Sequence, residues 1–389
     1  MITKSYPLRT ALIGLSSSAA TSWAAVAHLP GILSETGRSK IAIKALQNSS
    51  IDAAKSAIKT YKLPEDTKAY GSPEDLATDS DIDLVICNTR VDKHREVILP
   101  SIKAGKDVFV EWPIAANKQQ IEEIVEATKQ SGSRVAVGLQ RRWNPIVSTV
   151  RDLVQGGANL GKVLSVEVRI FGAMNDRETL PPGLKYFADK KIGGNAISIG
   201  VAHALDPLLS VIGDVDIATV QAKAQIQRPD VRVVDPKTKE VFEKVESDVP
   251  DLLSFNANIV GHNTAKDGTL AFFFRRGQPF PGTSSLTWLL NFELGEIKVE
   301  SPTTGFFEQG PNDKPITIHV HRFEDGIVEE VVWSWSEEQA ALPLSARSVS
   351  ATLFAFADGR DPGDGWVSLE DAAHRAELIE LLVNANSEA

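Results

Sequence analysis

Cysteine is nearly absent from this chain of 389 residues, in which Cys87 is the single example. One cysteine excludes a disulfide within the chain and argues against a zinc site built on cysteine. Long apolar runs of roughly 18 residues are also absent, and the first ten residues lead into a short strand without the apolar core of a signal peptide. We therefore expect a soluble, cytoplasmic protein that has no membrane partner.

An excess of positive charge is lacking as well. Lysine and arginine total 41 residues against 51 for aspartate and glutamate, which gives a net charge of -10 at pH 7. Such a surface repels phosphate groups, so we expect no direct contact with nucleic acid. The chain is longer than the roughly 250 to 300 residues that one core can organise. We therefore expect two domains, 1–145 and 146–389.

The first of these ranges alternates between short apolar runs and amphipathic segments. This alternation predicts an α/β domain, a Rossmann doubly wound parallel sheet covered by helices on both faces. The expected strands are 10–14, 40–46, 82–87, 106–111 and 134–138, and the helices between them include 52–61, 94–104 and 118–130.

A polar turn follows the first strand and precedes a helix, which is the layout that binds a pyrophosphate. The glycine-rich sequence typical of that turn is reduced to Gly14, while serines and alanines occupy the later glycine places. A serine-rich connection can also be a plain loop. If the turn binds a dinucleotide, the expected contacts are Gly14, Leu15, Ser16, Ser17, Ala19, Ser22 and Trp23.

The second strand ends in Gln47, Asn48, Ser49 and Ser50 without a carboxylate. An Asp or Glu there would bind a ribose 2′-hydroxyl and repel a 2′-phosphate. Its absence favours NADP over NAD as the cofactor. The simpler alternative is that these residues only cap the next helix.

Three further strand ends carry polar or aromatic side chains, and open parallel sheets bind ligands at such ends. The segment Val108–Pro113 is an apolar strand that breaks at a Glu-Trp-Pro corner, where the proline cannot continue the ladder. The residues expected to contact the ribose or nicotinamide are Asn88, Thr89, His94, Glu111, Trp112, Gln140 and Trp143.

The second half changes to period-two alternation, which predicts an α+β domain with a large, mostly antiparallel open sheet. The charged segment 229–250 is expected to be a surface excursion. The expected strands are 162–171, 252–260, 268–275, 286–293, 295–299, 317–322 and 329–335, and the helices are 146–155, 196–212, 346–358 and 369–385, the last of which could pack on the first domain.

Several motifs resemble the glucose-fructose oxidoreductase / inositol dehydrogenase (Gfo/Idh/MocA) family. They are the Gly14-Leu-Ser opening, Ala27-His-Leu-Pro-Gly-Ile, the Glu-Trp-Pro corner, Leu-Gly-Lys-Val-Leu-Ser at 160–165 and Val-Ser-Leu-Glu-Asp-Ala-Ala at 367–373. The chain looks most like the fungal branch that contains the galactose-regulon repressor. The resemblance implies NAD(P) binding in the first domain and a homodimer through the open sheet of the second.

Two positions depart from the pattern of the family's dehydrogenases. Trp112 stands where they carry a lysine that assists proton transfer, and Ile199 replaces the first aspartate of a motif that keeps His203 and Asp206. Trp112 could stack on a nicotinamide, floor an aromatic substrate pocket or merely fill space. On a regular helix, Ile199 and His203 would share a face.

The candidate catalytic residues are His203, as the proton acceptor, and Tyr186, as a proton donor to a carbonyl. His203 and Asp206 could equally be a hydrogen-bonded core pair. Trp112, Asn195 and Asp206 are the expected lining of the substrate pocket. His319 and His321 lack companion ligands, so no metal site is expected.

Two functions remain open. The first is an NAD(P)-dependent oxidoreductase that acts on a sugar-like or small hydroxyl or carbonyl substrate, with His203 and Tyr186 as the acid and base. The second is a redox-silent NAD(P)-binding regulator that acts through a protein partner, for which a nuclear location also fits.

Overall fold

The computed structural model describes residues 6–19, 22–172, 176–308 and 314–385. They divide into two compact units, of which the first takes the chain up to Gln140 together with 191–194 and 336–376. The second unit takes 141–190, 195–335 and the segment from Glu377 onward. This division differs from the two consecutive ranges expected from the sequence, because the late segment 336–376 groups with the first unit.

The first unit is built on a seven-stranded sheet in the order β19-β6-β5-β4-β1-β2-β3. Strands β1 to β6 are parallel, and β19 is an antiparallel edge strand that pairs with β6. This confirms the predicted parallel sheet. The strands are β1 (Leu8–Ile13), β2 (Ile41–Gln47), β3 (Lys68–Tyr70), β4 (Leu84–Cys87), β5 (Asp107–Glu111), β6 (Val135–Gly138) and β19 (Val367–Ser368).

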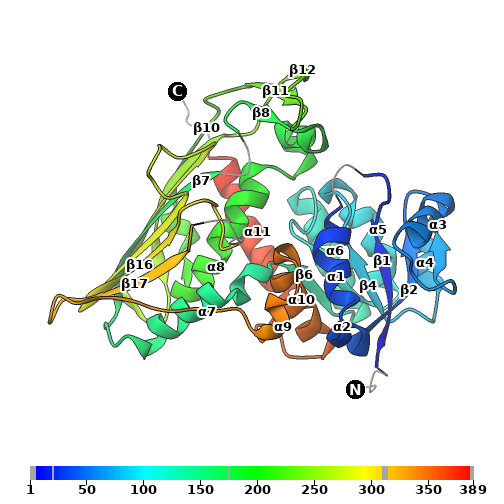
Figure 1. The fold of residues 1–389 in the computed structure, drawn as a ribbon, viewed down its shortest axis with the longest axis horizontal. Coiled ribbons are helices and arrows are strands. Elements are labelled where there is room, and N and C mark those ends of the chain that lie inside the picture. Colours follow the sequence, from blue (N-terminus) through cyan, green and yellow to red (C-terminus); the bar gives the residue numbers. More distant parts are fainter. Residues whose placement is uncertain (1–5, 20–21, 173–175, 309–313, 386–389) are drawn as a thin grey trace. The chain divides into compact units, whose positions relative to one another are not determined.

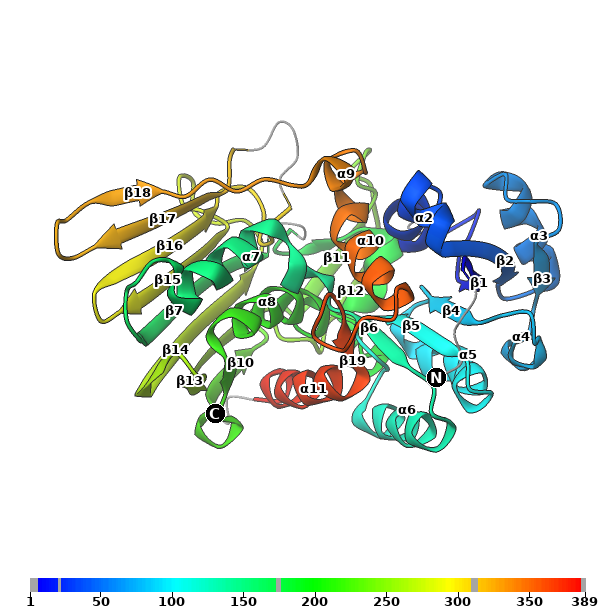
Figure 2. The same ribbon diagram turned by 90° about the horizontal axis from the view of Figure 1, so that it is seen from below.

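Helices cover both faces of this sheet, with α2 and α10 on one side and α5 and α6 on the other (Figure 2). The hydrophobic core joins residues of β1, β2 and β4 to buried side chains of α1 and α10. The helices of the unit are α1 (Leu29–Ile32), α2 (Glu35–Lys40), α3 (Ile51–Thr60), α4 (Pro73–Thr78), α5 (Val91–Lys103), α6 (Lys118–Ser131), α9 (Glu337–Ala340) and α10 (Leu344–Ala357).

Local sequence signals set several helix ends. Ser72 caps α4, where its Oγ accepts a hydrogen bond from the backbone N–H of Asp75 at 3.2 Å, and Pro73 occupies the first helical position. Helix α6 begins after the Asn117 cap and ends at Gly132, whose φ of 71° gives a left-handed C-cap. His94 lies inside α5 and does not open it, since that helix begins at Val91.

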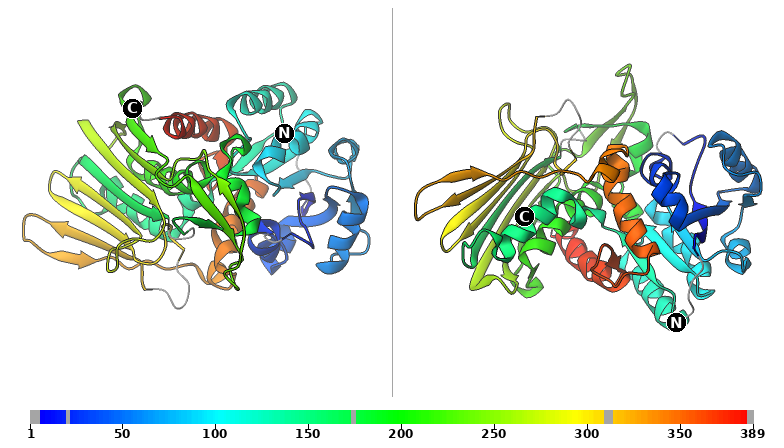
Figure 3. Two further views of the ribbon diagram at one scale, coloured as in Figure 1. Left: turned by 90° about the horizontal axis from the view of Figure 1, so that it is seen from above. Right: turned by 60° about the horizontal axis from the view of Figure 1, so that its bottom comes forward.

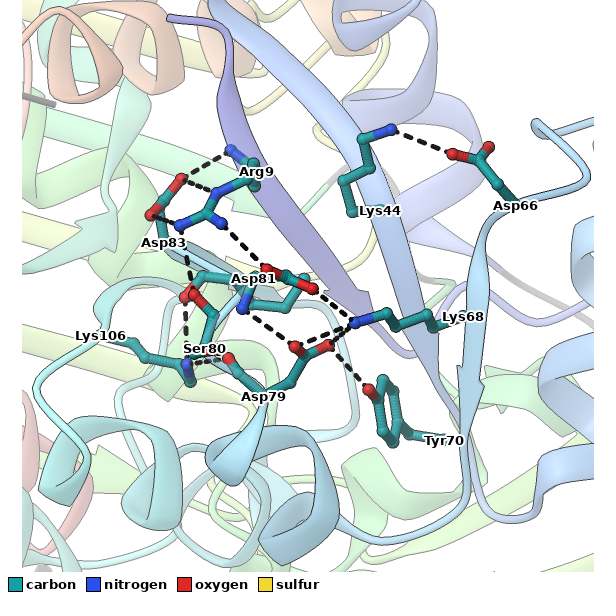
Figure 4. Close-up of polar contacts among 11 residues, drawn as sticks. Arg9, Lys44, Asp66, Lys68, Tyr70, Asp79, Ser80, Asp81, Asp83 and Lys106 are labelled. Atoms are coloured by element: carbon teal, nitrogen blue, oxygen red, sulfur yellow. Dashed lines mark hydrogen bonds and ion pairs between the residues drawn. The ribbon is translucent and has the colours of Figure 1, made fainter. Parts of the chain in front are cut away.

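A polar network connects the segments that lead into the parallel strands (Figure 4). Arg9 binds both carboxylate oxygens of Asp83, at 3.0 and 2.8 Å. Lys106 donates to the carbonyl of Asp79 at 2.6 Å, and burial lowers the pKa of its ammonium. Burial and the hydrogen bond to Asp79 raise the pKa of Tyr70 to about 12. Arg9 and Lys106 thus connect the segments at the amino-terminal ends of β1, β4 and β5, whereas Tyr70 ends β3.

The second unit contains a sheet in the order β10-β13-β14-β7-β15-β16-β17-β18, with β9 beside β13. Figure 2 shows the strands in that order, and Figure 1 shows β7, β16 and β17 of the same sheet. All pairs along that order are antiparallel except β7 with β14. The strands are β7 (Val163–Gly172), β9 (Asp214–Val215), β10 (Gln221–Gln225), β13 (Leu252–Val260), β14 (Thr264–Arg276), β15 (Leu286–Phe292), β16 (Gly295–Ser301), β17 (Thr317–Arg322) and β18 (Val328–Glu330).

Helices α7 (Pro145–Asp152) and α8 (Ala202–Ile212) lie against one face of this sheet, and its strands fan out side by side in both views of Figure 3. Along β15, Trp288 and Leu290 are fully buried, whereas Leu289 between them is half-buried on the opposite face. No helix of the described residues covers that opposite face in Figure 2.

The segment 229–250 is largely exposed, as expected of a surface excursion, but it contains two strands that were not predicted. Strands β11 (Asp230–Val234) and β12 (Val241–Glu246) pair with each other, and β11 pairs with β8 (Thr179–Leu180). The buried side chains of Val231 and Leu180 form a small core there. The predicted strand 329–335 ends at Glu330. The predicted helix 369–385 is confirmed as α11 (Leu369–Val383), which directly follows β19, and its residues up to Ala376 group with the first unit.

Among the described helices, none has the length and apolar character needed to cross a membrane.

Candidate functional site

The carboxyl ends of the parallel strands bring the predicted cofactor residues of the first unit to one edge. Ile13 is paired with Cys87 on β4 and with Gln47 on β2, and Glu111 is paired with Gly138. The residues that follow these positions therefore share one edge of the sheet, which is where open parallel sheets bind their ligands.

Gly14 is required at the turn that follows β1. Its φ is +90°, and a Cβ atom at this position would lie 3.0 Å from the backbone carbonyl of Asn88. Its N–H donates to the carbonyl of Gln47 at 3.1 Å, so the turn is tied to β2 as well. Only glycine adopts this conformation without strain and lets the two strand ends approach so closely.

Serine side chains hold the loop where the family motif places further glycines. The Oγ of Ser16 accepts hydrogen bonds from the N–H groups of Ser18 and Ala19 at 3.2 and 3.1 Å. The hydroxyl of Tyr61 donates to the Ser16 carbonyl at 2.8 Å. The hydroxyl oxygens of Ser17 and Ser56 are hydrogen-bonded to each other at 3.1 Å. The loop is thus shaped by hydroxyl groups rather than by glycine conformations.

The remaining residues of this first turn have different surroundings. Leu15 is fully buried, Ala19 is exposed and Trp23 is 37% exposed. The Ser22 hydroxyl oxygen is buried, and it has no hydrogen-bond partner among the described residues. Ser22 therefore has an unused polar group, whereas Trp23 presents a partly exposed aromatic ring.

The end of β2 is joined to the same turn. The side-chain amide of Asn48 donates to the Leu15 carbonyl at 2.9 Å, and Ser50 caps α3 by accepting from the N–H of Ala53 at 3.1 Å. Ser49 is exposed. Capping is thus one role of Ser50, and the hydroxyl of Ser49 remains directed at solvent beside the start of the helix.

Asn88, which follows β4, has a buried amide without a hydrogen-bond partner among the described residues. Its Nδ2 and Oδ1 atoms are both buried, and neither has a hydrogen-bond partner among the described residues. The Oε1 atom of Gln140 is buried and unpartnered in the same sense. An unsatisfied buried amide costs about 1 to 3 kcal/mol. A ligand with both donors and acceptors, such as the ribose and carboxamide of a nicotinamide dinucleotide, fits these groups.

His94 links two segments of this edge rather than facing it. One ring nitrogen, Nδ1, lies 2.8 Å from the Pro113 carbonyl, and the other, Nε2, lies 2.9 Å from the Thr89 carbonyl. The ring is buried, and burial lowers the pKa of His94. His94 therefore positions the backbone of the Trp112-Pro113 corner against Thr89.

The end of β5 carries a buried acidic side chain and a buried aromatic ring. Glu111 Oε1 lies 2.5 Å from His28 Nε2, and Trp112 is 5% exposed. His28 belongs to a π-helical turn, Ala24–His28. His28 was not among the predicted site residues, although it is the one polar residue of the segment Ala24–His28 and this was the available signal.

In the second unit, Asp206 forms a buried salt bridge with Arg142. Arg142 donates to both of its carboxylate oxygens, at 2.8 and 2.7 Å, and Asp206 is 1% exposed. Arg141, the preceding residue, pairs with Glu308 and places its guanidinium 4.2 Å from the centre of the Phe306 ring. The sequence suggested His203 as a possible partner of Asp206, whereas the structure pairs Asp206 with Arg142. The signal that was missed is the Gln-Arg-Arg-Trp segment at 140–143.

His203 lies on α8 and is 7% exposed. Burial, with a smaller contribution from the Arg141 charge, holds the pKa of His203 well below its usual value. Its Nδ1 atom is buried and has no hydrogen-bond partner in the described part of the chain. The ring is therefore neutral at pH 7, and it is able to accept a proton but not to donate one as an imidazolium.

The other predicted residues of the second unit are placed as follows. Asn195 is buried and caps the π-helical turn Ala196–Val201, where its Oδ1 accepts from the N–H groups of Ile197 and Ser198. That turn carries Ile199, so the regular i, i+4 spacing to His203 expected from the sequence is not kept. Tyr186 and Trp143 are half-buried. No group of three His, Cys, Asp or Glu residues suited to a metal ion occurs in the described ranges.

Two family descriptions match this chain. Residues 8–139 match the oxidoreductase family with the NAD-binding Rossmann fold (GFO_IDH_MocA), and residues 145–301 match the C-terminal domain of Gal80p. The two matches together extend over both units of the structure.

Similar proteins include regulators and enzymes. The galactose/lactose metabolism regulatory protein GAL80 of Saccharomyces cerevisiae is 26% identical over 309 residues, which cover 78% of this chain and 68% of that protein. The dehydrogenase aclE of Aspergillus oryzae is 25% identical over 302 residues, which cover 76% and 77%. The crystal structure of a super-repressor mutant of Saccharomyces cerevisiae Gal80p has a TM-score of 0.82 at 22% identity and covers 97% of this chain and 95% of that one.

Proposed function

We propose that the chain is an NAD(P)-dependent oxidoreductase, because residues 8–139 match the oxidoreductase family with the NAD-binding Rossmann fold and residues 145–301 match the C-terminal domain of Gal80p. Its substrate is a small, sugar-like molecule with a hydroxyl or carbonyl group. The observation that carries the proposal is the buried, unpartnered amide of Asn88 at the carboxyl edge of the first sheet, directly beside Gly14.

The chain's own residues would hold the cofactor as follows. The turn that begins at Gly14 and includes Ser16, Ser17 and Ser22 would bind the pyrophosphate. Asn88, Thr89 and Gln140 would bind the ribose and carboxamide of the nicotinamide half. The bound nicotinamide supplies the chemistry of accepting or giving a hydride.

NADP is the proposed preference over NAD. The end of β2 offers the Ser49 and Ser50 hydroxyls and the N-terminus of α3, and Asp52 is the first carboxylate after the strand. Hydroxyls and helix N–H groups accommodate a 2′-phosphate, whereas a carboxylate on the ribose would repel it.

Proton transfer falls to the second unit. In the oxidation of an alcohol, the carbon gives up a hydride and the hydroxyl gives up a proton, and the neutral ring of His203 is the proposed acceptor of that proton. Its lowered pKa makes it a weak base until substrate or cofactor binding changes its surroundings. In the reductive direction the phenol of Tyr186 is the proposed donor to the carbonyl oxygen. Asn195 and Asp206 would support the substrate pocket indirectly. Asn195 caps a helical turn, and Asp206 pairs with Arg142.

Trp112 would provide a flat apolar surface in place of the family's lysine. Such a surface suits the face of a nicotinamide or an apolar part of the substrate. It provides no proton donor equivalent to an ammonium, so the acid and base must come from other residues.

Calorimetric titration with NADP and NAD tests the cofactor step. Replacement of Asn88 by Leu should weaken binding by roughly tenfold or more, because the hydrogen bonds that the amide would make are lost. The exposed Asn256 on β13 provides a matched control, and Asn256→Leu should leave binding unchanged.

Absorbance at 340 nm, followed across sugars, polyols, aldehydes and imines, tests catalysis. A substrate should be turned over by the wild type and much more slowly by His203→Asn. Binding of the cofactor without turnover over the whole panel would contradict the enzyme proposal.

A redox-silent, NAD(P)-binding regulator is the second candidate. Trp112 and Ile199 stand at the positions of the lysine and aspartate, and residues 145–301 match the Gal80p domain. Such a protein would act on a protein partner, in the cytoplasm or in the nucleus. Two results together would support the regulator: a protein partner that binds the purified chain only in the presence of NAD(P), and no turnover of any substrate. Turnover of a substrate without any bound partner would reject it.

A further inference from the structure

We propose that Glu111, held by His28, makes the first unit bind the oxidised, positively charged form of the nicotinamide dinucleotide more tightly than the reduced form. This inference rests on the proposed function, because it concerns the same cofactor. It holds equally for an enzyme and for a regulator, since it describes binding and not turnover.

The strand order places Glu111 at the nicotinamide half of the site. Strand β1, whose end carries Gly14, lies between β2 and β4. A dinucleotide crosses such a sheet with its pyrophosphate at the first turn and its adenosine ribose at the end of the second strand. The other half then extends over the ends of β4 and β5, which carry Asn88 and Glu111.

The Glu111–His28 pair is buried and closely held. Oε1 and Nε2 are 2.5 Å apart, and the two side chains are 10% and 0% exposed. The His28 ring meets the Phe109 ring edge-on, with centroids 5.7 Å apart. A Cβ on Gly138 would lie 2.6 Å from Glu111 Oε2, so the glycine on β6 leaves room for the carboxylate. The carboxylate is thus fixed at the strand end.

The hydrogen bonds assign the charge of this pair. His28 Nδ1 is buried and has no partner among the described residues. A buried N–H without an acceptor is costly, whereas an unused lone pair is cheaper, so the proton belongs on Nε2. Nε2–H then donates to Glu111, which accepts as a carboxylate. The pair therefore carries one negative charge and no positive charge.

Neighbouring titratable groups do not cancel that charge. The Glu111 charge acts on both Cys87 and His94. Burial raises the pKa of the Cys87 thiol to about 11 and lowers the pKa of the His94 ring. Both groups are therefore neutral at pH 7, which leaves the carboxylate as the charged member of this cluster.

A fixed carboxylate distinguishes the two redox forms of the cofactor. The oxidised nicotinamide ring carries a positive charge and the reduced ring carries none, while the rest of the molecule is the same. Attraction at this partly buried edge should favour the oxidised form by roughly tenfold in dissociation constant.

Calorimetry on the full chain provides the test, with the oxidised and reduced forms of both NAD and NADP as the probes. The wild type should bind the oxidised form about tenfold more tightly, and Glu111→Gln, which keeps the shape and removes the charge, should abolish that ratio. Glu122→Gln removes an exposed carboxylate of α6 and should preserve it.

The outcomes separate this inference from the proposed function. An unchanged ratio in folded Glu111→Gln, or equal affinity for both forms in the wild type, overturns the inference and leaves the proposed function intact. If Glu111→Gln does not fold, two other measurements test the inference. The wild type should bind the oxidised form more tightly than the reduced form, and Glu111→Asp, which keeps the charge, should retain that preference. Failure of either form to bind rejects the proposed function together with the inference.

Discussion

Burial controls the reactivity of the single cysteine. Cys87 ends β4 fully buried, with its sulfur 3.5 Å from the Thr89 hydroxyl, and burial raises the pKa of the thiol to about 11. Because the thiolate is the reactive form, the folded chain should react with a disulfide reagent at pH 8 far more slowly than the unfolded chain. Thiol release followed by absorbance, with and without guanidinium, measures this; equal rates would contradict the burial.

A buried neutral histidine makes stability depend on pH. Since the pKa of His203 is lowered in the folded state, the unfolded chain binds more protons once the pH falls below about 6.5. Stability is therefore present above that pH and is lost as the pH falls through it, by up to about 1.4 kcal/mol per pH unit for each such group. His94 acts in the same direction.

Replacing His203 by Gln should remove its share of that loss. Urea unfolding at pH 7.5 and at pH 5.5 gives the free energy of unfolding for both proteins, and the difference between the two pH values should be smaller in the variant. Replacement of the half-exposed His321 provides the control, and it should leave the difference unaltered. A variant with the full wild-type loss would show that His203 is not neutral in the folded state.

At the scale of elements, the turn between β1 and the following helix depends on one glycine. Gly14→Ala forces a side chain into a positive φ and against the Asn88 carbonyl, so it should destabilise the first unit by roughly 1 to 3 kcal/mol. It should also weaken cofactor binding, because the ends of β1 and β4 separate. Thermal unfolding and calorimetry measure the two effects.

Gly132→Ala is the matched control. Gly132 also has a positive φ, but a Cβ there meets no atom within 4 Å. This variant should lose some stability and retain cofactor affinity. Equal affinity in both variants would argue that the Gly14 turn does not contact the cofactor.

At the scale of the whole molecule, we propose that two copies associate through the larger sheet. The face opposite α7 and α8 carries Leu289, which is paired with Glu167 on one side and Lys298 on the other. An apolar centre with charged surroundings is typical of an interface between subunits.

Leu289→Arg should therefore convert a dimer into a monomer, because it places a charge at the centre of that face. Light scattering after size-exclusion chromatography gives the mass. Val241→Arg makes the same change on β12, outside this sheet, and should leave the mass unaltered. A monomeric wild type, or a dimer that survives Leu289→Arg, would reject the interface.

The parallel sheet of the first unit could be predicted from the sequence because each strand is a continuous apolar run with its own turn signals. The segment 229–250 could not be predicted in this way. Val231 and Val233 alternate with charged residues over only a few positions, and their burial depends on Leu180, about fifty residues earlier in the chain. A short strand stabilised by distant partners leaves little local signal.

The parallel sheet of the first unit and the places of Gly14, Asn88 and Trp112 at its strand ends followed from the sequence alone, because strand ends and glycine requirements are local properties. The tertiary structure alone decided which polar groups are used. Asp206 pairs with Arg142, Glu111 pairs with His28, and the Asn88 amide has no partner within the described residues. These outcomes depend on burial and on contacts between residues far apart in the chain, which no local pattern records.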